Sequence, residues 1–432
     1  MAAKKKEQET NDSSKIELGS KEFFNELIKD TDFVKCDEGS LMNNRPKVLT
    51  PLYVLNCITG GGLPLAIQEE VSGVPASGKS TFCYSMLGTF QKQYGDNGVG
   101  VILDLEGSTD DTRLKQLGID SSKVLRLPAV SIESAFENMF KMFKKLIDMK
   151  EKTGKDIKLF IIFDSLSAGG IQAQHDSIEN GGTAMTFGSG MMALPRILKQ
   201  NMANVTPFLE KIDASVHYIN QVFMQGIGTY APRTGSGGGF GKDHMMDLKL
   251  EFGSPKNDVI KEGSTDYVVG SYSNLKMTKS KLGPKFSNIP CYVDVRNGGT
   301  IDEVKSLFMY LQNNDYIKTG AWQKFDDILD YMDKKFGTKI NKVQLDELRG
   351  NKRANDLLAI LREDVDLVDL MQIFLIEKIC DIYPAHSLVT NEFRQELINR
   401  CNYFVDKNVD VRNVDEVEEL DKEVVTEDTE TK

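Results

Sequence analysis

The sequence predicts an α/β fold in which a mostly parallel sheet carries helices on its faces. Short apolar runs typical of buried strands alternate with segments of helical periodicity, as in successive βαβ units. A glycine-rich turn at residues 73–80 lies between a strand-like and a helix-like segment. The chain has 432 residues, of which 40% are hydrophobic, so it can hold a globular core and two to three domains.

The glycine-rich turn fits the pattern G-x-x-x-x-G-K-[ST] of phosphate-binding loops. Backbone N–H groups can wrap a phosphate where the chain turns sharply from strand into helix. Lys79 is expected to reach the β- and γ-phosphates of ATP, and the Ser80 hydroxyl to bind Mg²⁺. The predicted nucleotide-binding residues of this turn are Gly73, Val74, Pro75, Ala76, Ser77, Gly78, Lys79, Ser80 and Thr81.

Apolar runs and alternating patterns predict further strands, and helical spacing predicts a helix from Glu133 to Lys150. Because strands of a parallel sheet point their carboxyl ends at the ligand crevice, polar residues at those ends are candidate site residues. The expected strands are Val99–Leu105, Leu159–Asp164, Val216–Gln221, Met245–Phe252, Leu275–Lys281 and Cys291–Val295.

Three strand ends carry the polar groups that a phosphate-loop hydrolase needs. Asp164 is expected to complete the Mg²⁺ shell, although a strand-end aspartate can also cap a helix. Glu106 can accept a proton from the attacking water. Asn220 and Gln221 end a further strand, and a neutral amide there could contact the γ-phosphate and relay its presence to the loop that follows.

Two long glycine-rich loops are expected, at about 167–190 and 222–242. Loops of this length inside a compact domain tend to be functional or mobile. The expected organisation is an N-terminal segment at 1–45, partly disordered and a candidate subunit contact, a core at 46–300, a smaller C-terminal domain at 301–405 and an acidic disordered tail at 406–432. The tail holds 11 acidic and 4 basic residues, hence -7 of the net charge of -11.

Bulk properties narrow the class of protein. A net charge of -11 is not that of a simple basic DNA-binding protein. The six cysteines form no C-x-x-C pair, so neither a zinc site nor a dithiol motif is indicated, and a reduced, intracellular chain is expected. There is no signal-peptide pattern and no apolar run of about 18 residues, so membrane association is not expected.

From Ile58 to Phe325 the order of segments resembles the RecA/RadA recombinases, especially their bacterial and phage members. Residues 60–64 precede the phosphate loop as in that family. The catalytic-glutamate segment of the family is resembled by residues 103–107 followed by 117–120. Its metal-binding aspartate segment is resembled by residues 162–166, and its switch-glutamine segment by residues 219–221. Residues 268–271 and 279–281 resemble the segment that caps ATP on a neighbouring subunit, and 320–322 resemble a marker near the end of the core.

The resemblance implies a RecA-type P-loop ATPase core that forms a helical filament on single-stranded DNA and pairs it with homologous duplex DNA. ATP and Mg²⁺ would lie between subunits, with Glu106 as the base, Gln221 as the sensor, and Lys279 and Lys281 acting from the neighbouring subunit. Asp110 and Arg113 would contact the nucleotide. The implied DNA contacts, in the two loops, are Phe187, Phe223, Ile227, Tyr230, Arg233, Gly238, Gly239 and Lys242.

Single-strand-binding and mediator proteins are further implied partners, and the cytoplasm of a bacterial or phage-infected cell is the implied location. Two alternatives stay open: a regulatory or paralogous RecA-fold ATPase that binds a protein without exchanging strands, and a RecA-fold replicative helicase. Lys279, Lys281 and residues 320–322 favour the recombinase. The second loop is only weakly basic, so the regulatory alternative stays open.

Overall fold

The computed structural model describes residues 20–29, 45–128, 131–172, 187–225 and 233–409. The chain divides into two compact units, Met1–Arg45 and Pro46–Lys432. In the first unit, helix α1 (Lys21–Ile28) begins where the Ser20 side chain accepts a hydrogen bond from the backbone of Phe23. The rest of this section concerns the second unit.

The sheet of the second unit confirms the predicted α/β class. Its continuous path within the described residues runs β13-β12-β11-β9-β3-β7-β6-β4-β5, with β10 beside β11 and β8 beside β7. The strands from β9 to β5 are parallel, and β11, β12 and β13 extend the sheet in antiparallel fashion. The parallel strands are β3 (Gln68–Gly73), β4 (Gly98–Asp104), β5 (Val124–Pro128), β6 (Lys158–Asp164), β7 (Ala214–Gln225) and β9 (Leu248–Phe252).

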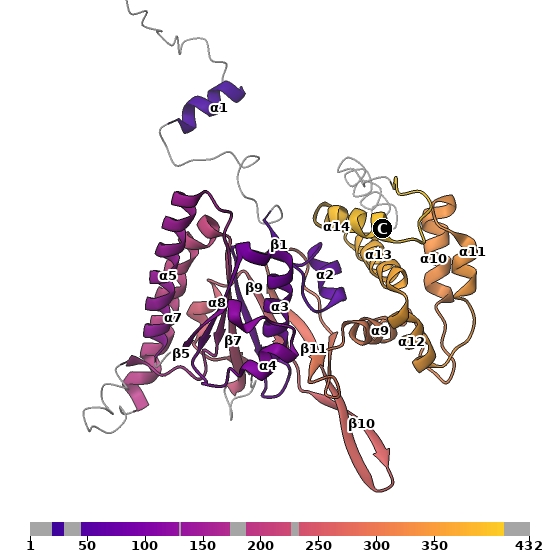
Figure 1. Ribbon diagram of the computed structural model, residues 1–432, viewed down its shortest axis with the longest axis horizontal. Coiled ribbons are helices and arrows are strands. Elements are labelled where there is room, and N and C mark those ends of the chain that lie inside the picture. Colours follow the sequence, from indigo (N-terminus) through magenta and orange to yellow (C-terminus); the bar gives the residue numbers. More distant parts are fainter. Residues whose placement is uncertain (1–19, 30–44, 129–130, 173–186, 226–232, 410–432) are drawn as a thin grey trace, which may run out of the picture. The chain divides into compact units, whose positions relative to one another are not determined.

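The remaining strands include a hairpin that the sequence analysis did not predict. Strand β10 (Lys256–Glu262) pairs with the first part of β11 (Thr265–Ser280), and this hairpin extends away from the core in Figure 1. Strands β12 (Ile289–Asp294) and β13 (Thr300–Ile301) complete the antiparallel edge, and β1 (Lys47–Val48) and β2 (Leu63–Pro64) form a separate small sheet.

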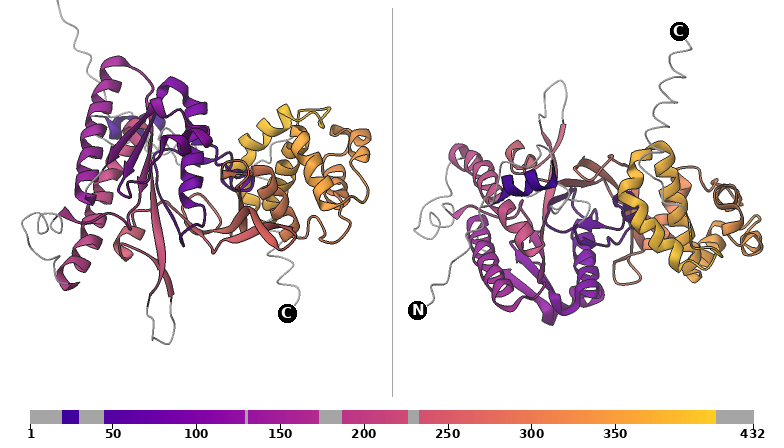
Figure 2. Two further views of the ribbon diagram at one scale, coloured as in Figure 1. Left: turned by 60° about the horizontal axis from the view of Figure 1, so that its bottom comes forward. Right: turned by 90° about the horizontal axis from the view of Figure 1, so that it is seen from above.

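Helices cover both faces of the sheet. Helix α5 (Ile132–Thr153) and helix α7 (Phe187–Leu209) lie side by side on one face, and α3 (Lys79–Tyr94) and α4 (Asp111–Gln116) lie toward the other (Figures 1 and 2). Helix α5 begins at a capping box of Ser131 and Ser134 and ends at Gly154, which adopts the left-handed conformation.

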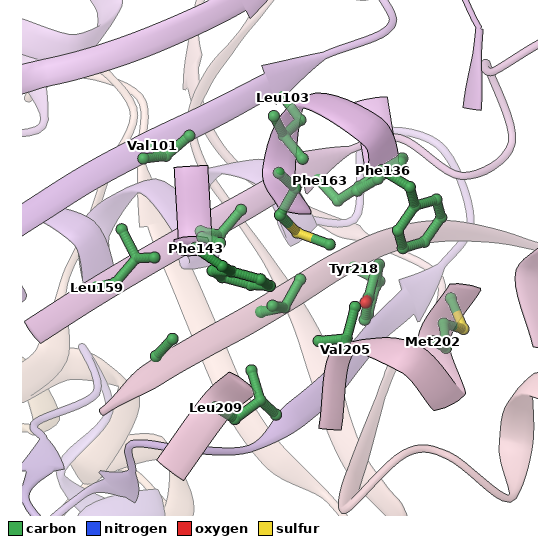
Figure 3. Close-up of a cluster of buried hydrophobic side chains, with 14 of the residues drawn as sticks. Val101, Leu103, Phe136, Phe143, Leu159, Phe163, Met202, Val205, Leu209 and Tyr218 are labelled. Atoms are coloured by element: carbon green, nitrogen blue, oxygen red, sulfur yellow. The ribbon is translucent and has the colours of Figure 1, made fainter. Parts of the chain in front are cut away.

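The main core lies between the sheet and helices α5 and α7. Phe136 and Phe143 of α5 recur at helical spacing, and the Phe136 ring contacts Phe163 and Tyr218 of the sheet. Phe143 and Leu209 of α7 belong to the same buried cluster (Figure 3). All five side chains are buried. These aromatics therefore serve packing, and the core holds the central strands in fixed register.

The C-terminal helices belong to the same compact unit as the core. They pack on α2 (Tyr53–Thr59): Cys57 Sγ donates to the carbonyl of Gln372, and His386 Nε2 lies 2.7 Å from the carbonyl of Ile58. These helices are α9 (Glu303–Asn313), α10 (Asp326–Phe336), α11 (Lys342–Glu347), α12 (Ala354–Glu363), α13 (Val365–Ile382) and α14 (Ser387–Arg400).

The predicted boundary of the acidic tail lies too early. Lys339 Nζ donates to the carbonyl of Asn408 at 2.8 Å, and Gln395 donates to the carbonyl of Lys407 at 2.8 Å. The chain is thus hydrogen-bonded to the C-terminal helices beyond Asp406. Residues 410–432 of the predicted tail lie outside the described residues.

The two predicted glycine-rich loops are shorter than expected. Helix α7 already begins at Phe187, so the first loop ends before 190. In the second, β7 continues to Gln225 and pairs antiparallel with β8 (Arg233–Ser236), and residues 240–243 form the short helix α8 (Phe240–Asp243). Strand pairing satisfies the backbone groups of this segment, which glycine content alone does not reveal. Among the described helices, none has both the length and the apolar composition needed to cross a membrane.

Candidate nucleotide site

Four adjacent parallel strands bring the predicted site residues to one edge of the sheet. Gly73, at the end of β3, pairs with Gln221 of β7. The next strand, β6, ends at Asp164, which pairs with Asp104 of β4. Glu106 follows Asp104 by two residues, and its backbone N–H donates to the carbonyl of Asp164. The strand order therefore places the phosphate loop, the candidate sensor, the candidate metal ligand and the candidate base in one row.

The phosphate loop turns from β3 into α3 with the geometry that its glycines require. A Cβ atom on Gly73 would lie 2.6 Å from the carbonyl oxygen of Phe252, and Gly78 has φ +97° at the start of α3. Lys79 Nζ donates to the carbonyl of Val74 at 2.7 Å, and burial lowers the pKa of this lysine.

A pocket of about 220 Å³ opens over the loop, between Ala76–Thr81 and two antiparallel strands. Ser271 of β11 and Val293 of β12 form its far wall. The β11–β12 pairing thus places Ser271 beside the phosphate loop of its own chain, while the expected contact of residues 268–271 with the nucleotide of a neighbouring subunit stays a prediction.

Asp164 fits the role of a magnesium ligand. Its Oδ2 accepts a hydrogen bond from the Tyr84 hydroxyl at 2.8 Å, while its Oδ1 is buried and accepts none from the described residues. Ser80 lies one helical turn before Tyr84, on the same face of α3. No cluster of three or more His, Cys, Asp or Glu side chains that could hold a metal occurs in the described residues. Mg²⁺ bound mainly by phosphates and water, with one carboxylate and one hydroxyl from the protein, fits this arrangement.

Magnesium-dependent ATP binding is expected to weaken as the pH falls through about 6. Burial, together with the nearby Glu106 and Asp104 carboxylates, raises the pKa of Asp164 to about 6, against the hydrogen bond from Tyr84. Below that pH the carboxyl is neutral and cannot bind the cation, so affinity should fall by up to about tenfold per pH unit. Titration of a fluorescent ATP analogue with and without Mg²⁺ across this range measures the effect. Asp164→Asn should bind weakly at every pH. A magnesium requirement independent of pH in the wild type would place the metal elsewhere.

Glu106 is exposed at the site edge and held by a neighbouring serine. Its Oε1 accepts a hydrogen bond from Ser165 Oγ at 2.5 Å. The loop that carries it is organised by buried Asp104, whose Oδ1 accepts from the N–H of Gly107 at 2.7 Å and whose Oδ2 pairs with Arg126 at 2.6 Å. The two carboxylates of this segment thus have different surroundings. The hydrogen bonds of Asp104 hold the loop in place, whereas Glu106 is exposed to solvent, where a water molecule is available.

Arg113 is anchored beside the start of α3. Its guanidinium donates to Thr81 Oγ1 at 3.0 Å and to the carbonyls of Gly298 and Gly299. The Asp110 carboxylate accepts from the Arg113 backbone at 3.0 Å and caps α4. A guanidinium fixed in this way can stack its flat face on a base. The Asp110 carboxylate instead accepts a hydrogen bond from the first turn of α4.

Gln221 stands beside the phosphate loop with an exposed side chain. Its backbone is fixed by the preceding residue: the Asn220 Oδ1 accepts from the Gln221 N–H at 2.9 Å. The Gln221 carbonyl accepts from the N–H of Gly237, beyond β8. The candidate sensor is therefore connected directly to the β7–β8 hairpin.

Lys279 and Lys281 lie away from the phosphate loop of their own chain. In the β9–β11 register Leu275 pairs with Phe252, which adjoins Gly73, and Lys279 lies four residues further along β11, about 13 Å at 3.3 Å per residue. Lys279 Nζ donates to the carbonyl of Asp243, and Lys281 Nζ pairs with Asp247 at 2.6 Å.

The predicted DNA-contacting residues are only partly accessible. Phe223 is 49% exposed on β7. Gly238 and Gly239 have φ of +92° and +74°, and Cβ atoms there would meet Leu198 and Pro195 of α7, so close packing requires glycine at both. Ile227, Tyr230 and the side chains of Phe187 and Arg233 lie outside the described residues.

The expectation that Lys242 contacts DNA phosphates is wrong for this structure. Its side chain is 0% exposed, and its Nζ lies 2.6 Å from Glu70 Oε1 and 3.0 Å from Asp243 Oδ1. A fully buried ammonium group that is bonded to two carboxylates and to the Ser236 hydroxyl has no face left for a phosphate.

Tyr84 and Ser165 were not predicted as site residues, and Asn220 was predicted only as a neutral amide beside Gln221; all three hold a predicted residue in position. Tyr84 holds Asp164, Ser165 holds Glu106, and Asn220 holds Gln221. Ser165 and Asn220 are sequence neighbours of predicted residues. Tyr84 follows Ser80 by four residues, which is the helical spacing that could have indicated it.

A phosphate loop at a strand-to-helix turn, facing a buried aspartate two strands away, defines a P-loop nucleotide-binding protein. The sequence matches the RecA N-terminal domain family over residues 47–299, which is more than half of the chain. The chain therefore belongs to the RecA family.

Proteins named RecA are similar to this chain over most of their own length. The RecA of Ureaplasma parvum is 27% identical over 275 residues, covering 62% of this chain and 74% of that protein. The RecA of Clostridioides difficile is 28% identical over 273 residues, with 62% and 70% covered. The RecA of Mannheimia haemolytica is 26% identical over 313 residues, with 71% and 73% covered.

Proposed function

We propose that the protein is an ATP-dependent recombinase that assembles on single-stranded DNA, hydrolyses ATP and exchanges strands with homologous duplex DNA. The observation that carries this proposal is the row of strand ends. The phosphate loop, Gln221, Asp164 and Glu106 meet at one edge, and β7 runs on from the sensor into a hairpin. Membership of the RecA family and similarity to proteins named RecA support it.

In the proposed reaction, a water oxygen attacks the γ-phosphorus, the bond to the β–γ bridging oxygen breaks, and ADP and phosphate are released. Glu106 accepts the proton from that water, oriented by Ser165. Lys79 and the N–H groups at the start of α3 stabilise the phosphate oxygens. Mg²⁺, when bound at Asp164 and Ser80, would neutralise charge on the β- and γ-phosphates.

The proposal is tested by measuring ATP hydrolysis with and without single-stranded DNA, and strand exchange between a labelled single strand and homologous duplex. A recombinase is stimulated by the single strand and exchanges only homologous partners. The same duplex with a scrambled sequence is the matched control. Hydrolysis that ignores DNA, together with no homology-dependent product, would contradict the proposal.

One observation favours the regulatory alternative, in which the protein binds ATP and a protein partner without exchanging strands. Lys242 is withdrawn from the second loop into a buried ion cluster, so it adds no accessible cation there. The strand-exchange assay separates the two functions, because a regulator would hydrolyse or bind ATP and give no exchanged product.

Lys281→Ala is expected to bind ATP normally and to lose most DNA-stimulated hydrolysis. Lys281 cannot reach its own phosphate loop along β11, so we propose that it acts on the phosphates of a neighbouring subunit. A cation supplied across an interface contributes about 10³-fold or more in rate. Lys281→Ala and Glu106→Gln each damage a different side of such a shared site.

Mixed filaments of Lys281→Ala and Glu106→Gln subunits should therefore recover partial hydrolysis, since some interfaces receive one intact residue from each chain. Lys285→Ala mixed with Glu106→Gln is the matched control for a nearby lysine and should retain the activity expected from dilution alone. Proven co-assembly without recovery would contradict a shared site.

A further inference from the structure

A buried cluster of charged side chains begins three residues before the phosphate loop. Glu70 of β3 is 0% exposed, and its Oε1 lies 2.6 Å from Lys242 Nζ while its Oε2 lies 3.0 Å from Lys249 Nζ. Asp243 Oδ1 completes the cluster, at 3.0 Å from Lys242 and 2.7 Å from Lys249. None of these groups is needed for the chemistry described above.

The cluster is balanced in charge: two carboxylates face two ammonium groups. Burial by itself would raise the pKa of Glu70, but Lys242 and Lys249 outweigh it and hold the pKa below its ordinary value. Removing one member leaves an uncompensated buried charge, whereas removing a matched pair does not. Such clusters often contribute less to stability than to fixing one arrangement of the elements that they join.

Glu70 joins the phosphate strand to the sensor and to the hairpin. Asn220 Nδ2 donates to Glu70 Oε1 at 2.7 Å and to the carbonyl of Gly237 at 2.9 Å, while its Oδ1 holds the Gln221 backbone. On the other side, Lys242 Nζ donates to Ser236 Oγ at 2.8 Å, on β8. One carboxylate oxygen thus connects the strand of the phosphate loop with both arms of the β7–β8 hairpin.

We propose, on the basis of the proposed function, that Glu70 is a positioning residue that couples ATP binding to DNA binding through Asn220 and Lys242. A shift of Gln221 toward the γ-phosphate moves the Asn220 amide, because the two are hydrogen-bonded. Glu70 is fixed in β3, so the amide cannot move without changing its bonds to Glu70 and to Gly237. The shift is passed in this way to the hairpin, whose other arm Glu70 holds through Lys242.

The neighbouring Glu69 provides a matched comparison. It is equally buried on the same strand, but it points to the opposite side, where His217 Nδ1 lies 2.5 Å from its Oε2. His217 lies on β7 three residues before Asn220, and within the described residues the Glu69 side chain has no hydrogen bond to Asn220, Lys242 or β8. Glu69→Gln therefore removes a buried carboxylate without touching the proposed connection.

The test measures the affinity of the full chain for single-stranded DNA twice, once with a non-hydrolysable ATP analogue and once with ADP. The affinity with the ATP analogue divided by the affinity with ADP is the nucleotide ratio of each variant. Glu70→Gln is expected to lower this ratio by about tenfold, while its affinity for a fluorescent ATP analogue without DNA changes by less than about twofold. Lys242→Met should lower the ratio similarly. Glu69→Gln should keep the wild-type ratio, even where its melting temperature falls.

The double variant Glu70→Gln/Lys242→Met separates coupling from stability. It restores the charge balance, so its melting temperature should recover relative to either single variant while its ratio stays low. If the double variant recovered both its melting temperature and its ratio, or if Glu70→Gln kept the wild-type ratio, the role of Glu70 would be overturned and the proposed function would stand. If Glu70→Gln does not fold, the double variant supplies the same comparison. A wild type that binds DNA equally with both nucleotides would overturn the proposed function as well.

Discussion

Lys79→Ala is expected to abolish ATP hydrolysis while the protein stays folded. The side chain lies at the start of α3, and its ammonium group makes a hydrogen bond only to the loop carbonyl of Val74 among the described residues. Loss of the charge on the β- and γ-phosphates should reduce the rate by at least about 10²- to 10³-fold, as for other preorganised electrostatic groups. Loss of one hydrogen bond costs about 1 kcal/mol of stability.

The measurement is steady-state ATP hydrolysis with saturating single-stranded DNA, alongside a melting curve. Lys92→Ala is the matched control, because Lys92 is an exposed lysine in the last turn of the same helix. It should retain wild-type hydrolysis. Normal turnover by Lys79→Ala at a normal melting temperature would show that residues 73–80 are not the phosphate site.

Glu106→Gln is expected to bind ATP as well as the wild type does and to hydrolyse it about 10²- to 10⁴-fold more slowly, because only the proton acceptor is lost. Glutamine keeps an oxygen that can accept the hydrogen bond from Ser165, so the side chain should keep its position. Complexes with DNA should accumulate in the ATP-bound state and dissociate slowly.

Three readings define this second experiment: ATP affinity, hydrolysis in a single turnover, and the lifetime of the DNA complex after dilution. Asp111→Asn is the control, since Asp111 is an exposed carboxylate of the following helix, paired with Lys115 at 2.6 Å. It should behave as wild type in all three. Loss of ATP binding by Glu106→Gln would make this residue structural and exclude it as the base.

The local patterns of the sequence predicted much of the candidate site. The phosphate loop was identified from its own residues, because its glycines, lysine and serine act within one turn of chain. Asp164 and Glu106 were identified because buried strands are recognisable as apolar runs, and residues that end them must face the crevice of a parallel sheet. The structure brings these residues together at the carboxyl ends of neighbouring strands.

Predictions that relied on composition were less successful. The glycine-rich segment at 222–242 was expected to be a loop, but much of its described part is a hairpin arm and a short helix. The helices after residue 301 were expected to form a smaller C-terminal domain, and the structure adds that they pack on α2 through contacts such as His386 to Ile58. Composition reports neither the pairing of strands nor the surface on which a helix is buried.

The sequence by itself determined the α/β class, the phosphate loop and the carboxylates at the strand ends, since each depends on residues close together in the chain. Only the tertiary structure decided the environment of two other residues. Lys242 pairs with Glu70, 172 residues earlier in the chain, and Arg113 donates to the carbonyl of Gly298, 185 residues later. An exposed and a buried lysine look the same in a sequence. Their difference arises from the register of β3, β7 and β9, which brings the compensating charges together and which no local pattern records.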